Sequence, residues 1–128
     1  MADFLMRKHP NAKVALISSM QDEVIRLFFS SGLRNCAGFE TADPVAITMG
    51  QIFPDTYYPA DQYSTALNDL RARFSSTGRL ATYYMGGLNV TLHQHTFRPR
   101  FFEATAGGET LAQFVTEFLA GDVKSVGP

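Results

Sequence analysis

The sequence predicts an α/β fold with about two parallel strands and flanking helices. Residues 12–18 centre on the apolar run Val14-Ala15-Leu16-Ile17, which is typical of a strand buried on both faces of a parallel sheet. Residues 79–85 contain Thr82, Tyr83 and Tyr84 and give a second strand signal. Helical periodicity lies between the two strands, and a strand–helix–strand order favours parallel pairing.

Four stretches are expected to be helical. Residues 3–9 form the short tail of a helix. Residues 21–31 carry an apolar stripe, and Gly32 is a natural stop. Residues 60–75 repeat apolar side chains at helical spacing, and residues 110–120 form an amphipathic helix.

The remaining segments are predicted as connections. Residues 33–59 show no sustained period and are too long for an ordinary connection, which indicates a functional loop or an insertion. Gly86 and Gly87 break the second strand, and residues 90–93 are a candidate short edge strand.

Composition excludes several classes of function. The net charge of -1 argues against nucleic acid or an anionic membrane surface as a partner. No apolar run approaches the ~18 residues that a membrane span needs. The N-terminus lacks the pattern of a signal peptide. Cys36 is the single cysteine, so an internal disulfide and a cysteine-based zinc site are excluded.

An acid follows the first predicted strand and a histidine follows the second. Asp22 begins the helix after residues 12–18, and His95 comes after the Gly86-Gly87 break. Parallel strands would bring both to the carboxyl edge, where open α/β sheets place their sites. In an α/β-hydrolase this order presents the last two triad members. His95 would then act as the general base, and Asp22 would fix its tautomer.

Other interpretations of these residues stay open. Asp22 is suited to capping the N-terminus of its helix, and His95 is also typical of an ordinary loop histidine. His93 is an alternative base. Together, His93 and His95 form a His-x-His pair that resembles two metal ligands, but no carboxylate or third histidine lies nearby in sequence. We expect no metal and no cofactor.

The third triad member is missing from the sequence. No G-x-S-x-G nucleophile elbow occurs in residues 1–128. Two parallel strands also make a poor sheet, because their open edges need neighbours. Residues 1–128 are therefore expected to be a single, incomplete domain: the C-terminal portion of an α/β-hydrolase, with the missing strands upstream.

Several segments resemble one esterase family. Residues 15–28 resemble the triad-acid region of bacterial pectin acetylesterase-like proteins, whose superfamily includes plant pectin acetylesterases and the Notum carboxylesterase. Residues 63–71 resemble the family's helix between acid and base. Tyr83-Tyr84 with residues 95–97 resemble its strand and catalytic histidine, and residues 107–121 resemble its closing helix. The resemblance covers most of the chain from about residue 10 onward.

The resemblance implies a serine carboxylesterase that removes acyl groups, such as acetyl, from a carbohydrate or a related ester. The expected partner is an ester substrate such as an acetylated polysaccharide. Asp22 carries over as the triad acid and His95 as the base. The nucleophile and the oxyanion-hole glycines have no counterparts here. Members of this family are usually exported, so the resemblance, and no feature of the sequence itself, implies a periplasmic or extracellular location.

A small, non-catalytic α/β interaction domain, complete as written, is the alternative function. Residues 39–58 or 97–102 would be its contact surface, because both are rich in aromatic side chains. Arg98 and Arg100 alternate with aromatics in the second segment, a pattern also seen in nucleic-acid binding. We favour an aromatic-anchored loop that packs onto the last helix.

Overall fold

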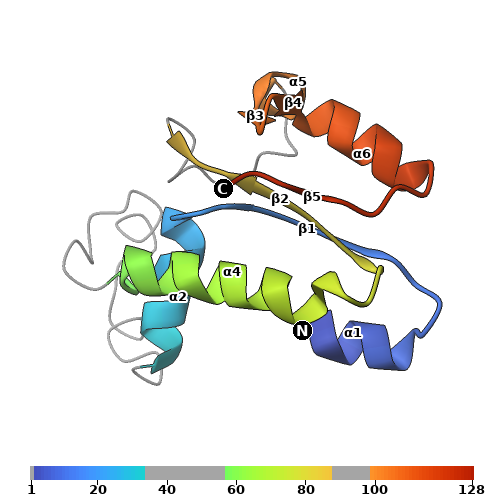
Figure 1. The fold of residues 1–128 in the computed structure, drawn as a ribbon. Coiled ribbons are helices and arrows are strands. Elements are labelled where there is room, and N and C mark those ends of the chain that lie inside the picture. The colour runs from blue at the N-terminus through green and yellow to red at the C-terminus, as the bar shows by residue number, and fades with distance from the viewer. Residues whose placement is uncertain (1, 34–56, 88–98) are drawn as a thin grey trace.

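The computed structural model describes residues 2–33, 57–87 and 99–128, and these form a parallel sheet with helices on both faces (Figure 1). The sheet has the order β1-β2-β5, from β1 (Val14–Ser19) through the central β2 (Leu80–Met85) to β5 (Ser125–Val126). The α/β class predicted from the sequence is thus confirmed.

The strand pairing explains which strand is most buried. β1 and β2 pair in parallel from Val14↔Leu80 to Ser19↔Met85, whereas β5 pairs with β2 only through Thr82↔Ser125 and Tyr83↔Val126. All six residues of β2 are buried, while the first four of β1 are only half-buried. Both predicted strands are therefore present, and the sequence missed β5, which is too short to show periodicity.

The helices divide between the two faces of the sheet (Figure 1). On one face lie α1 (Ala2–Lys8), α2 (Glu23–Leu33) and α4 (Ala60–Ser75). On the other lie α5 (Arg100–Glu103), the hairpin of β3 (Thr105–Ala106) and β4 (Glu109–Thr110), and α6 (Leu111–Leu119). None of the described helices is long and apolar enough to cross a membrane.

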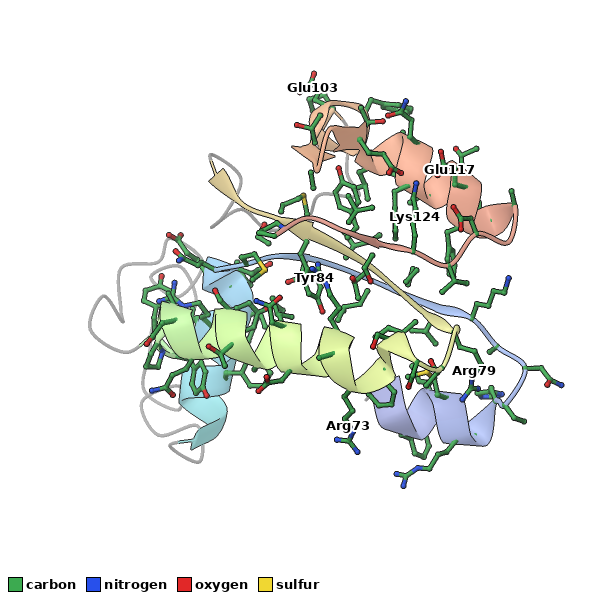
Figure 2. All side chains as sticks on the ribbon, viewed as in Figure 1. Arg73, Arg79, Tyr84, Glu103, Glu117 and Lys124 are labelled. Atoms are coloured by element: carbon green, nitrogen blue, oxygen red, sulfur yellow. The ribbon has the colours of Figure 1, made fainter. Side chains whose placement is uncertain are left out.

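Successive side chains of β2 point to opposite faces of the sheet, so β2 packs against the helices on both faces. Tyr83 packs on the α6 side, where its ring centroid lies 5.1 Å from that of Phe114. Tyr84 points the other way and packs with Tyr63 and Leu67 of α4 (Figure 2). Both tyrosines are fully buried, so β2 is the centre of the core.

The predicted helices are present with small shifts. α4 has the bounds expected from the sequence, and α6 begins after Thr110, whose side chain and that of Gln113 form a capping box. The stripe on α2 is buried only in part: Ile25 packs against the core, whereas Phe28 is 61% exposed. The expected loop, residues 33–59, lies almost wholly outside the described residues, and residues 90–93 lie outside them.

Arg71 of α4 forms hydrogen bonds that connect β5 to the rest of the sheet. Its guanidinium donates hydrogen bonds to Thr82 Oγ1 at 2.9 Å, to Val126 O at 3.1 Å and to Pro128 O at 2.8 Å. The same group lies over the ring of Tyr84, 4.1 Å from its centroid. One side chain therefore joins α4, β2 and the residues around β5.

Candidate functional site

Asp22 lies at the carboxyl edge of the sheet, three residues after the end of β1. It is 4% exposed, and its Oδ1 accepts a hydrogen bond of 2.9 Å from the backbone N–H of Ile25. This contact caps the first turn of α2, where a carboxylate is also favoured by the helix dipole. The capping role considered from the sequence is thus confirmed, and it explains why α2 begins at Glu23.

The turn that carries Asp22, residues 19–22, is attached to β2. Within the turn, the Asp22 N–H donates a hydrogen bond to Ser19 O at 3.4 Å. The Met20 N–H donates to Met85 O at 2.9 Å, which extends the β1–β2 ladder by one bond beyond the paired strands. The backbone of the turn is therefore held beside the end of β2.

Helix α4 contributes one hydroxyl group to this turn and another to Ser18, directly before it. Tyr63 Oη lies 3.0 Å from Ser18 Oγ, and Ser64 Oγ donates to Met20 O at 2.6 Å. Ser18, Tyr63 and Asp22 are all buried. The carboxyl edge of β1 is thus a buried polar cluster that consists of the turn 19–22 with Ser18, Tyr63 and Ser64.

Tyr63 is electrostatically coupled to this cluster. Burial raises the pKa of the Tyr63 hydroxyl, the hydrogen bond with Ser18 lowers it, and the negative charge of Asp22 raises it further. The net direction is upward, so the hydroxyl is protonated at neutral pH and has a hydrogen to donate.

His95 and the alternative base His93 lie outside the described residues, so the structure leaves the Asp22–His95 pair untested. What the structure does place is the end of β2: Met85 is level with Ser19 in the parallel register. The chain that leads to His95 thus departs from the edge of the sheet that holds Asp22. The predicted His-x-His metal pair lies outside the described residues as well. Among the residues with defined positions, no group of three or more His, Cys, Asp or Glu could hold a metal ion.

Sequence reasoning missed the hydroxyls of Tyr63 and Ser64. Tyr63 fits the apolar stripe of residues 60–75, and it does pack into the core, so its polar end gave no separate signal. The available signal was the Ser18-Ser19 pair: polar residues at the end of an apolar strand need hydrogen-bond partners when they are buried.

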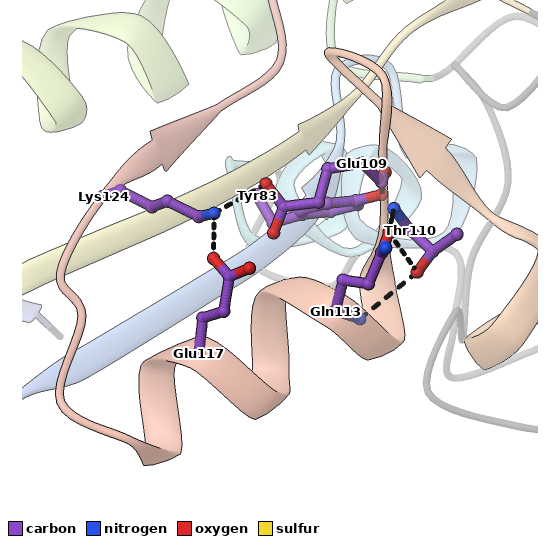
Figure 3. A network of polar contacts seen from close by, with 6 residues as sticks. All are labelled: Tyr83, Glu109, Thr110, Gln113, Glu117 and Lys124. Carbon is purple, nitrogen blue, oxygen red and sulfur yellow. Dashed lines mark hydrogen bonds and ion pairs between the residues drawn. The ribbon is translucent and has the colours of Figure 1, made fainter.

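A second polar cluster lies on the opposite face of the sheet (Figure 3). Lys124, just before β5, forms ion pairs with Glu109 of β4 at 2.8 Å and with Glu117 of α6. These carboxylates raise the pKa of the Lys124 ammonium group. The hydroxyl of Tyr83 lies 2.7 Å from the backbone oxygen of Glu109, to which it donates. This cluster connects β4, α6 and the approach to β5, which is a structural role.

The segment of residues 97–102 is described from residue 99 onward. There, Phe101 packs against the core cluster that includes Leu111 and Phe114, as expected for a loop anchored on the last helix. Phe102 meets Phe101 edge-on with ring centroids 5.1 Å apart and is 59% exposed.

Comparison of the chain with protein-family models, with curated proteins and with solved structures gave no match.

Proposed function

We propose that this chain provides the acid and the base of a serine carboxylesterase triad and is the C-terminal portion of an α/β-hydrolase. His95 would take the proton from a serine outside residues 1–128, and Asp22 would fix the His95 tautomer. The ester substrate would be an acylated carbohydrate or a related compound, as the resemblance to pectin acetylesterase-like proteins implies.

The supporting observation is the position of Asp22. It is a buried carboxylate that follows the carboxyl end of β1, and β1 pairs with β2, the strand from which the chain continues to His95. Sites in open α/β sheets form at this edge. A carboxylate offers about four lone-pair positions, so capping α2 is compatible with accepting a hydrogen bond from an imidazole.

The test is a pH titration of the three histidine imidazoles by NMR in the wild type and in Asp22→Asn. Asparagine is as good an N-cap as aspartate, so α2 should stay intact. Loss of the carboxylate removes the charge that favours the imidazolium. The pKa of His95 should therefore fall by about one unit or more.

Glu23→Gln is the matched control, because it removes a neighbouring carboxylate that is exposed on the same helix terminus. We expect it to leave His95 unchanged. If the pKa of His95 is the same in Asp22→Asn as in Glu23→Gln, the proposal is contradicted. If Asp22→Asn shifts the pKa of His93 alone, His93 is the base.

A second expectation concerns turnover. Because the sequence lacks a G-x-S-x-G elbow, the 128-residue chain should hydrolyse a simple aryl acetate only at the background rate. Hydrolysis well above background that is lost in His95→Ala would place a nucleophile among the serines of this chain and would contradict that part of the proposal.

The alternative, a non-catalytic interaction domain, has one observation in its favour. Phe102, in the segment predicted as a contact surface, is 59% exposed. The titration described above separates the two functions, because an interaction domain gives no reason for Asp22 to be coupled to an imidazole.

A further inference from the structure

We infer that Tyr63 and Ser64 are positioning residues for Asp22. They are consecutive residues of α4: Tyr63 contacts Ser18, directly before the turn 19–22, and Ser64 contacts Met20 within the turn. The inference rests on the proposed function, since it specifies how the triad acid is held in place.

Tyr63 acts through Ser18. Ser18 Oγ donates to Ser19 O at 3.0 Å, and a hydroxyl group has only one hydrogen. The 3.0 Å contact between Tyr63 Oη and Ser18 Oγ is then donated by Tyr63. The result is a chain of two hydrogen bonds that ends on the carbonyl at the start of the turn, which also accepts from the Asp22 N–H.

Ser64 acts on the next carbonyl of the turn. Its Oγ lies 2.6 Å from Met20 O and 2.9 Å from Ala60 O, so its single hydrogen is directed mainly to the shorter contact. Met20 is meanwhile tied to β2 through its N–H. The turn is thus fixed between β2 and α4, and its position depends on both neighbours.

These contacts differ from ordinary helix serine contacts. Ser75, at the end of α4, also donates back to its own helix, at 2.9 Å to Ala72 O, but it is exposed and that bond stays within α4. Removing the Ser64 hydroxyl releases a carbonyl of the turn, whereas removing the Ser75 hydroxyl does not. Ser75→Ala is therefore a matched control for Ser64→Ala.

Tyr63→Phe has a control on the other face of the sheet. Tyr83 is also buried, and its hydroxyl donates to the backbone carbonyl of Glu109 in β4, away from the turn. Tyr83→Phe therefore removes a buried hydroxyl of the same kind without touching Asp22.

The experiment is the NMR titration of the histidines in these four variants, with Asp22→Asn as the reference. We expect Tyr63→Phe and Ser64→Ala each to lower the pKa of His95 by about half a unit, because a displaced carboxylate stabilises the imidazolium less well. The control variants should leave His95 unchanged. Exchange of the Ile25 amide should quicken in the first two variants, because it reports the cap made by Asp22.

The outcomes separate this inference from the proposed function. If Asp22→Asn shifts His95 and neither Tyr63→Phe nor Ser64→Ala does, the triad proposal stands and the positioning role is refuted. If Asp22→Asn leaves His95 unchanged, the triad proposal fails and the positioning role fails with it. Equal shifts in the test and control variants would indicate general destabilisation and would also refute the positioning role.

Discussion

At Gly127, directly after β5, the backbone passes very close to the backbone of β2. Its φ is +100°, and a Cβ at this position would overlap the backbone oxygen of Tyr84. Only glycine fits, because it tolerates positive φ and has no side chain to clash. The path of the chain after β5 thus depends on one small residue.

Replacing Gly127 with Ala should lower the free energy of unfolding by about 3 kcal/mol or more, because backbone strain and a steric overlap act together. Thermal or urea unfolding measures the loss. Gly108→Ala is the control: φ is +82° there, but nothing lies within 4 Å of the added Cβ. The control should cost only the strain, about 1–2 kcal/mol. Equal losses in the two variants would show that the contact with Tyr84 is relaxed easily.

Near the candidate site, the sequence predicts the position of Asp22 but not the contacts that surround it. Asp22 was predicted at the carboxyl edge because it follows an apolar strand, and the structure places it there. The contacts of Tyr63 and Ser64 with the turn were not predictable, since they depend on the distance between α4 and β1. The contacting residues are 45 and 44 positions apart in the sequence, so that distance is set by packing rather than by a local pattern.

At the scale of elements, periodicity predicted the long segments and missed the short ones. The helix predicted from the apolar stripe of residues 60–75 is present as α4, and three residues of that stripe, Tyr63, Leu67 and Phe74, are buried. On α2 the same kind of stripe leaves Phe28 and Phe29 more than half exposed, since periodicity shows that a stripe exists but not what covers it. β5 has two residues and is held by tertiary contacts, so no local signal marks it.

The attachment of β5 gives a prediction for Arg71. Arg71→Lys keeps the charge but loses the planar fork that reaches Thr82, Val126 and Pro128 together. We expect a loss of about 1–2 kcal/mol in the free energy of unfolding. The amide of Thr82, which donates to Lys124 O, should exchange faster with solvent.

Arg73→Lys, two residues further along α4, is the control for this prediction. Arg73 is exposed and lies over the ring of Phe74, away from β5 (Figure 2). It should leave the exchange of the Thr82 amide unchanged. Slower or unchanged exchange in Arg71→Lys would show that β5 is held by its strand pairing alone.

The whole molecule should be sensitive to alkaline pH because its core contains buried phenols. Burial raises the pKa of both Tyr83 and Tyr84 to about 12. In the unfolded chain these groups ionise near pH 10. Above that pH the unfolded state holds fewer protons than the native state, so stability falls as pH rises from about 10 to 12.

This prediction is checked by thermal unfolding across that pH range, together with the ultraviolet absorbance of phenolate. Tyr83→Phe removes one of these buried phenols, so its unfolding temperature should fall less steeply with pH than that of the wild type. A wild-type protein whose unfolding temperature is constant from pH 10 to 12 would contradict the assignment of the two phenols to the core.

The arrangement of helices around β1, β2 and β5 has a consequence for handedness. The three strands follow one another across the sheet in one direction, so two right-handed crossovers would put their helices on the same face. Instead α4 and α6 lie on opposite faces (Figure 1). The two connections therefore have opposite hands, and one of them is of the rare left-handed kind. Because β5 pairs over only two residues, we expect it to join the sheet last, after β1 and β2 have already formed their ladder.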